Sequence, residues 1–165
     1  MLHPWHSSHI GRDFIRSAFG ARTADKSELP QAGIMNIMKK TLVSIVEDDR
    51  FFRDSMRRLM RSLGYMFDVF SSAAEFLASP RLNETACLIV DVNMPAMSGL
   101  ELYRRLVDTG HAIPTILITA FPNDVDRARA LNDSVTCYLA KPVDQQNLTR
   151  CLDAVLASGG LTENP

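Results

Sequence analysis

The chain has 165 residues, of which 46% are hydrophobic and 22% are charged. That is enough for one globular domain with a hydrophobic core, with some length left over. The formal net charge of −1 gives no basic excess for nucleic acid or a membrane surface. No apolar run approaches the roughly 18 residues of a membrane span, and the N-terminus lacks the apolar segment of a secretory signal. These features predict a cytoplasmic protein that binds neither nucleic acid nor membrane directly.

Residues 1–37 differ in composition from the rest of the chain. They mix His, Ser, Gly and Arg, show no strand pattern, and contain one short amphipathic piece near residues 14–19. We interpret them as an N-terminal extension that is disordered or reflects an upstream start codon. The expected organisation is this extension, a folded domain at 38–158 and a C-terminal tail at 159–165.

Short apolar strands alternate with amphipathic helices from residue 41 onward. The first half predicts strand 41–46, helix 50–63, strand 65–70, helix 72–77 and strand 87–90. The second half predicts helix 99–107, strand 115–119, helix 123–131, strand 135–139 and a last helix capped by Asp144. Ser72 and Ser98 are expected N-caps, and Gly64 is the expected stop after the first helix. Five such units predict an α/β fold with a doubly wound parallel sheet covered on both faces.

Polar side chains follow four of these strands. Glu47 and Asp48 come after the first strand, Asp91 ends the third, Thr119 ends the fourth, and Lys141 follows the fifth. In an open parallel sheet, ligands bind at the carboxyl ends of the strands. We therefore expect three acids, one hydroxyl and one ammonium group to meet at one edge of the sheet.

This set of groups has a chemical logic. Clustered carboxylates repel one another, and Mg²⁺ relieves that repulsion while also bridging phosphate oxygens. Glu47, Asp48 and Asp91 are the expected metal ligands. Lys141 and Thr119 are then suited to contact phosphoryl oxygens, one as a charge and one as a hydrogen-bond donor. The combination predicts phosphoryl transfer onto an aspartate.

Four motifs resemble one known family when they are taken in order. "SIVEDD", "LIVDVNMPAMSGLEL", "ILITA" and "YLAKP" are similar to the signatures of the receiver domain of bacterial two-component response regulators, of the nitrogen-fixation-regulator type. The resemblance covers roughly residues 40–157. It implies a flavodoxin-like (βα)5 fold with strand order 2-1-3-4-5, in which the first and third strands are neighbours.

The resemblance implies roles for the acidic residues. Asp91 matches the phosphoacceptor, while Glu47 and Asp48 match the acidic pair that binds Mg²⁺ together with Asp91. The backbone carbonyl of Asn93 is implied as a further metal ligand. Glu47 departs from the aspartate of many members, and its longer side chain should be tolerated.

The resemblance also implies a switch. Thr119 matches the switch hydroxyl, Tyr138 the switch aromatic, and Lys141 the lysine that contacts the phosphoryl group. The bond between Lys141 and Pro142 is often cis in this family. Phe121 is bulky at a position that helps to set the lifetime of the phosphoryl group.

The implied function is a stand-alone, single-domain response regulator. Only "SGGLTENP" follows Ala157, which is too short for an output domain. We expect a sensor histidine kinase or a histidine phosphotransfer protein as donor and another protein as target. The protein is expected to be a monomer or weak dimer and to catalyse only its own phosphorylation and dephosphorylation, without being an enzyme otherwise.

Two other functional classes stay open at this point. A receiver-like binding module that is never phosphorylated would have lost part of the site, whereas all of it is present here. A phosphatase with an aspartate nucleophile would need a second acid two residues after Asp91, where this chain has Asn93. The sequence contains no P-loop, no zinc-ligand spacing and no nucleophile-His-acid triad.

The cysteines, the arginines of the first helix and the histidines near the N-terminus are interpreted without assigning them a functional site. Cys87 and Cys137 lie in apolar runs, and together with Cys151 they show no CxxC spacing, so we expect buried thiols in a reducing compartment. The arginines of the first helix are favoured as a solvated surface rather than a kinase-docking face. They are Arg50, Arg53, Arg57, Arg58 and Arg61. The histidines near the N-terminus, His3, His6 and His9, are favoured as a chance triplet rather than a metal site.

Overall fold

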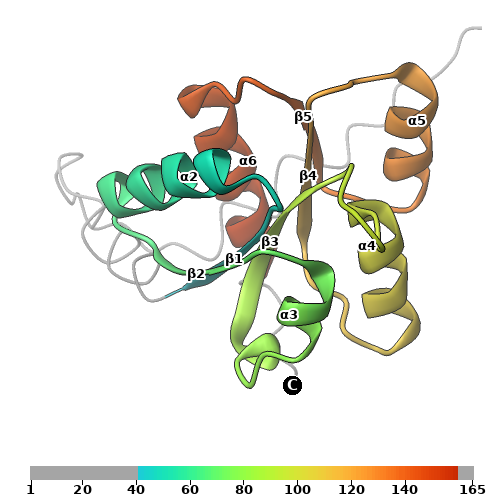
Figure 1. Cartoon of the computed structure of the whole chain (residues 1–165), viewed down its shortest axis with the longest axis horizontal. Coiled ribbons are helices and arrows are strands. Elements are labelled where there is room, and N and C mark those ends of the chain that lie inside the picture. Colours follow the sequence, from blue (N-terminus) through green and yellow to red (C-terminus); the bar gives the residue numbers. More distant parts are fainter. Residues whose placement is uncertain (1–40, 160–165) are drawn as a thin grey trace, which may run out of the picture. The chain divides into compact units, whose positions relative to one another are not determined.

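A five-stranded parallel sheet forms the centre of residues 41–159, the part of the chain that the computed structural model describes. Its strand order is β2-β1-β3-β4-β5, as the sequence predicts, and helices cover both faces (Figure 1). The predicted extension 1–37, with its histidine triplet, lies outside the described residues. So does nearly all of the predicted tail 159–165.

The elements alternate along the chain as expected. The first half contains β1 (Leu42–Val46), α2 (Arg50–Leu63), β2 (Met66–Phe70), α3 (Ala73–Leu77), a short 3-10 helix η1 (Leu82–Glu84) and β3 (Thr85–Asp91). The second half contains α4 (Gly99–Asp108), β4 (Thr115–Thr119), α5 (Asp124–Asn132), β5 (Cys137–Ala140) and α6 (Gln145–Gly159). The fifth strand begins two residues later than predicted. The reason is that the backbone N–H of Val135 donates to the carbonyl of Ala130 at the end of α5 and does not enter the sheet.

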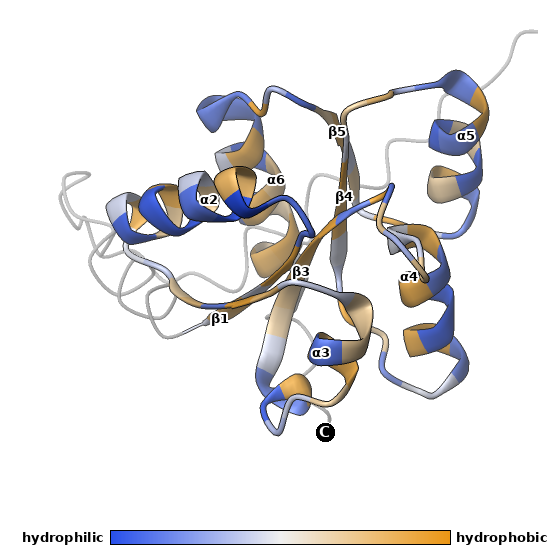
Figure 2. Cartoon of the chain, viewed as in Figure 1, coloured by the Kyte–Doolittle hydropathy of each residue, from blue (hydrophilic) through white to orange (hydrophobic). Residues whose placement is uncertain are grey.

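Alternating side chains divide the core between the two faces of the sheet. Val43 and Ile45 of β1 pack with residues of α2 and α6 on one face. Val46 of β1 and Val90 of β3 pack with residues of α3, α4 and α5 on the other. In Figure 2, α4 carries hydrophobic residues on the side toward the sheet and hydrophilic residues on the outside. The strands buried on both faces are mostly apolar, and the charged residues of β1 and β3 come at the carboxyl ends of those strands.

Side-chain caps define where the helices begin and end. Ser98 and Glu101 form a capping box at the start of α4, and the Ser72 hydroxyl accepts a hydrogen bond from the backbone of Glu75 at the start of α3. Gly64 ends α2 in the left-handed conformation, with φ of 77°. These three predicted caps are confirmed. The caps also determine where the loops at the carboxyl edge of the sheet turn into helices.

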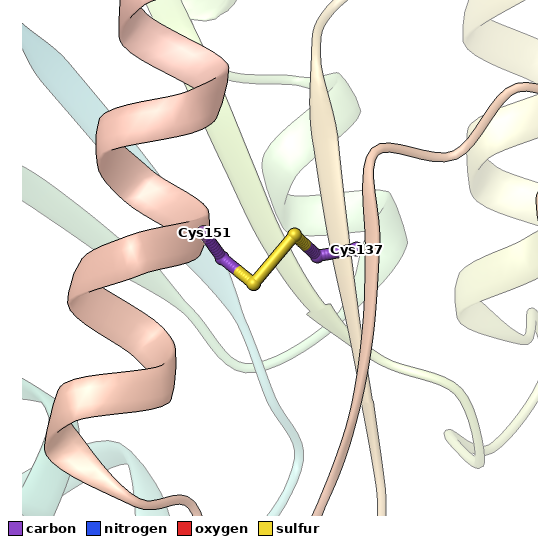
Figure 3. Close-up of a disulfide and its surroundings, with 2 residues drawn as sticks. All are labelled: Cys137 and Cys151. Carbon is purple, nitrogen blue, oxygen red and sulfur yellow. A yellow bond between two sulfur atoms is a disulfide. The ribbon is translucent and has the colours of Figure 1, made fainter.

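The prediction of buried thiols is right for Cys87 and wrong for Cys137. Cys87 is a free, fully buried thiol, and burial raises its pKa to about 12. Cys137 is only half-buried and forms a disulfide with Cys151 (Figure 3). The side chain of Cys137 faces the α2 and α6 side of the sheet, where α6 packs. The two Cα atoms are 6.1 Å apart, within the usual range for a disulfide.

We predict that Gly99→Ala destabilises the domain by about 3 kcal/mol, because a new methyl group has no room at this position. The Gly99 N–H donates to the Val92 carbonyl at 3.0 Å, and an added Cβ would collide with the carbonyl oxygen of Asp91. Urea denaturation measures the change. Gly110→Ala is the control: its φ of 82° adds strain of about 1 kcal/mol, but its Cβ meets open space. A Gly99→Ala variant as stable as the wild type would contradict the prediction.

Candidate functional site

Three carboxylates meet where β1 and β3 end. The two strands are paired in parallel with Val46 opposite Val90, so Glu47 and Asp91 leave the sheet side by side. Glu47, Asp48 and Asp91 each offer a carboxylate oxygen within 4.8 Å of the others. Glu47 and Asp91 are buried, whereas Asp48 is exposed. The acidic cluster that the sequence predicts is therefore present, and it opens to solvent on the side of Asp48.

Lys141 reaches this cluster from the far end of β5. Its Nζ donates a hydrogen bond to Oε2 of Glu47 at 2.7 Å and lies 3.2 Å from Oδ1 of Asp91. The ammonium group also lies over the ring of Phe52, 4.2 Å from the ring centroid. The peptide bond between Lys141 and Pro142 is cis. The sequence predicts Lys141 at this edge of the sheet, but it does not show the contact with Phe52, which comes from the first turn of α2.

Burial and ion pairing act in opposite directions on the pKa values of Glu47 and Lys141. Burial raises the pKa of Glu47, and the hydrogen bond from Lys141 opposes this without reversing it; the charge of Asp91 raises it further. Burial acts to lower the pKa of Lys141, but Glu47 and Asp91 together more than offset that effect and raise it. One ammonium group thus faces two buried carboxylates and an exposed one, which leaves excess negative charge for a cation to neutralise.

Oδ1 of Asp91 is buried, and its contact in the described part of the chain is an ion pair of 3.2 Å with the Lys141 ammonium group. A buried carboxylate oxygen held by so few partners leaves room for a bound ion as a further one. Hard carboxylate oxygens at this spacing fit Mg²⁺. The residues present therefore suit a divalent cation, with one oxygen of Asp91 available for chemistry.

Thr119 lies at the end of β4 and is fully buried. Its Oγ1 accepts hydrogen bonds from the side-chain amide of Asn93 at 2.8 Å and from the backbone N–H of Phe121 at 3.1 Å. Its proton is not used in either bond. The sequence implies a metal-ligand role for the backbone carbonyl of Asn93, which stays a prediction. The bond from the Asn93 side chain is an additional role that sequence reasoning missed.

Tyr138 occupies the face of β5 opposite to Cys137. Its ring packs against the core on the α3, α4 and α5 side, and its hydroxyl oxygen is buried without a hydrogen-bond partner among residues 41–159. Burial raises its pKa, and the charge of Asp126 raises it further. The aromatic ring is therefore already turned inward on the Thr119 side of the sheet. Phe121, by contrast, is 76% exposed next to the site.

Arg53 is the residue near the site whose predicted role is wrong. Its Nη1 donates to the backbone carbonyls of Glu47 at 2.6 Å and Asp48 at 2.5 Å, so it supports the acidic loop and is not simply solvated. The prediction of an exposed surface holds for three other arginines of α2, which are Arg50, Arg58 and Arg61. The role of Arg53 could have been inferred from its position, because it lies one turn into the helix that follows the acidic loop.

Comparison with known proteins identifies the family. Residues 43–153 match the model of the response regulator receiver domain. The chain belongs to this family. Nodulation protein W of Bradyrhizobium diazoefficiens is 37% identical over 128 residues, which cover 78% of this chain and 55% of that protein. Response regulator protein TodT of Pseudomonas putida is 31% identical over 127 residues, which cover 76% of this chain and 56% of that protein.

Solved structures agree with this assignment. The response regulator StyR is 34% identical with a TM-score of 0.66, and the match covers 73% of this chain and 61% of that one. FixJ-N is 27% identical with a TM-score of 0.65, covering 72% of this chain and 94% of that one. The predicted resemblance and the flavodoxin-like fold are thus confirmed. The receiver spans little more than half the length of the curated relatives that it matches.

The receiver fold brings the predicted site residues to one edge of the sheet. Glu47, Asp48, Asp91 and Lys141 form one contiguous cluster, and Thr119 lies one strand further along. Within the described range 41–159, no helix is long and apolar enough to cross a membrane.

We predict that Glu47→Gln stabilises the receiver at neutral pH in the presence of a chelator. Folding raises the pKa of Glu47 through burial, so the ionised form costs stability above that pKa and the neutral amide does not. The gain should shrink as the pH falls toward 4.5, the ordinary value, because the wild-type side chain then becomes protonated. Denaturation curves across this pH range measure the gain.

Glu101→Gln is the matched control for this experiment. Hydrogen bonds from Ser98 lower the pKa of Glu101, so the ionised form is favoured by folding and its loss should reduce stability at neutral pH. If Glu47→Gln were also less stable than the wild type at neutral pH without Mg²⁺, the argument from burial would fail.

Proposed function

We propose that this receiver accepts a phosphoryl group on Asp91 in a Mg²⁺-dependent reaction and signals through altered contacts with another protein. The observation that carries the proposal is the buried carboxylate of Asp91, which lies beside two further carboxylates and whose Oδ1 forms an ion pair of 3.2 Å with the Lys141 ammonium group. The donor is a sensor histidine kinase or a histidine phosphotransfer protein. Beyond its own phosphorylation and dephosphorylation, the receiver acts as a signalling protein and not as an enzyme.

The acidic cluster supports the role of Mg²⁺. Glu47, Asp48 and Asp91 would hold the ion, with the backbone carbonyl of Asn93 as a further ligand. Mg²⁺ bound there would neutralise the cluster and offset the negative charge of an incoming phosphoryl group. The exposed position of Asp48 leaves the solvent side of the cluster open for water ligands and for the donor.

The transfer itself is a displacement at phosphorus. A carboxylate oxygen of Asp91 attacks the phosphoryl group of a phosphohistidine, and an O–P bond forms while the N–P bond breaks. The electron pair of that bond goes to the imidazole nitrogen. Neutral imidazole leaves when the other ring nitrogen of the phosphohistidine carries a proton, and otherwise the departing nitrogen takes a proton from solvent. Lys141 is already placed against Asp91 and balances the negative charge that the phosphoryl oxygens bring.

A groove beside Lys141 supports docking of such a donor. It has a volume of about 530 Å³. Residues of α2 and of the segment after β5 line it: Phe52, Ser55, Met56, Leu59, Lys141, Pro142 and Val143. Phe51, next to this lining, is 81% exposed. An apolar surface at the entrance to the phosphoacceptor suits a partner that must bring a histidine to Asp91.

The switch that we propose begins at Thr119. Its hydroxyl proton can be donated to an oxygen of a phosphorylated Asp91, and this would draw Thr119 away from Asn93. The buried hydroxyl of Tyr138 lies on the Thr119 side of the sheet, so its position depends on the space that Thr119 leaves. The readout is the surface formed by α5, β5 and α6.

We expect Asp91→Asn to abolish phosphorylation, because an amide cannot serve as the nucleophile. The receiver is incubated with Mg²⁺ and acetyl phosphate, and intact mass is measured. The wild type should gain one base-labile phosphoryl group, and Asp91→Asn should gain none. Asp108→Asn, on the exposed end of α4, is the control and should label as the wild type does. Equal labelling of Asp91→Asn, or no labelling of the wild type by this donor or by a kinase, would overturn the proposal.

Asp48→Ala should remove the stabilisation that Mg²⁺ gives. At a concentration ten times the dissociation constant, Mg²⁺ should add about 1.4 kcal/mol to the stability of the wild type. Thermal denaturation with and without Mg²⁺ measures this effect, and Asp124→Ala, an exposed acid on α5, serves as control. A Mg²⁺-dependent gain that persists in Asp48→Ala would place the metal site elsewhere.

A further inference from the structure

The disulfide joins the edge strand of the sheet to the last helix. Cys137 belongs to β5, which is hydrogen-bonded to β4 alone, and Cys151 belongs to α6 (Figure 3). On α6, Leu148 and Leu152 flank Cys151 and are completely buried. The bond therefore attaches a strand with one neighbour to a helix that is firmly packed on the core.

The three cysteines divide into an inert thiol and a reactive pair. Cys87 is completely buried, has no partner, and has a pKa raised to about 12, so it forms almost no thiolate. Cys137 and Cys151 are both partly exposed and lie within bonding distance of each other. Oxidation to an intramolecular bond is therefore expected of this pair and not of Cys87.

The bond encloses the segment that carries two residues of the site. The loop that it closes, residues 137–151, contains Tyr138 and Lys141. Tyr138 follows Cys137 directly and faces the opposite side of the same strand. A displacement of β5 as a whole would move Tyr138 and Cys137 together, and the covalent bond to α6 resists that displacement.

We propose that Cys137 and Cys151 form a reversible redox modification site that restrains the segment carrying Lys141 and Tyr138. The oxidant is a low-molecular-weight disulfide. One cysteine thiolate attacks it to form a mixed disulfide and releases one thiolate, and the second cysteine thiolate attacks the mixed disulfide and releases the other. Both cysteine protons go to solvent and both leaving thiolates regain protons. The pair loses two electrons, and the small disulfide is reduced to two thiols.

The expected consequence rests on the proposed function at Asp91. During transfer, Lys141 must leave Glu47, to which it donates at 2.7 Å, and engage the incoming phosphoryl oxygens. The oxidised receiver holds β5 against α6 and limits that movement. It should therefore accept the phosphoryl group several-fold more slowly than the dithiol form.

The first measurement tests the redox site without any phosphorylation. The full chain is equilibrated in mixtures of reduced and oxidised glutathione and quenched with acid. It is then denatured and alkylated with a maleimide, and its intact mass is measured by mass spectrometry. The reduced wild type should carry three adducts, and the oxidised form one, on Cys87. Cys87→Ala should keep the transition, and both Cys137→Ser and Cys151→Ser should abolish formation of the intramolecular bond. A wild type that keeps three reactive thiols even in excess oxidised glutathione would overturn the proposal.

The second measurement tests the coupling to the site. Oxidised and reduced wild type are labelled with acetyl phosphate and Mg²⁺, and the initial rates are compared. The oxidised form should label several-fold more slowly, whereas Cys151→Ser should label at one rate under both conditions. Equal rates for the two wild-type forms would overturn the coupling while leaving phosphorylation intact. Absence of labelling in both forms, with the disulfide still forming, would instead show that the proposed function has failed.

Discussion

The structure depends on the repulsion among carboxylates at the ends of β1 and β3 and on the ammonium group that opposes it. Parallel pairing of these two strands forces Glu47 and Asp91 together with little exposure to water. Lys141 relieves part of the repulsion, and it can do so because β5 ends on the same edge of the sheet. One cation does not balance the cluster, since burial still raises the pKa of Glu47. The unfolded chain has no such conflict, so the site is maintained by the stability of the rest of the domain.

The fifth strand shows how one short element serves two functions. Its alternating side chains place Tyr138 on the face with α3, α4 and α5, and Cys137 and Leu139 on the face with α2 and α6. The first face lies toward Thr119, and the second carries the disulfide to α6. Lys141 follows at the end of the strand, where it meets the acids of β1 and β3. Within residues 41–159, β5 is an edge strand that pairs with β4, and β2 is the other edge strand, so the position of β5 is more easily biased than that of a central strand.

The sequence predicted the supporting residues of the site less well than its reactive ones. Arg53 looked like part of a charged helix surface, yet it donates to the carbonyls of the acidic loop. Phe52 packs against the core from α2, and its ring also lies beneath the ammonium group of Lys141. The same residue types occur on many solvated helix faces, so composition and spacing do not distinguish these roles. They follow from the angle at which α2 leaves the acidic loop.

The sequence by itself determined the order of strands and helices, three of the helix caps and the polar residues that follow four of the five strands. These features are local: hydrophobic periodicity, a serine before a helix and a carboxylate after an apolar run act over a few residues. Only the tertiary structure decided which groups touch. The hydrogen bond between Lys141 and Glu47 joins residues that are 94 positions apart in the sequence. The disulfide between β5 and α6 joins residues that are 14 positions apart. Such contacts depend on the packing angles and register of whole elements, and hydrophobic burial sets these for the entire domain at once.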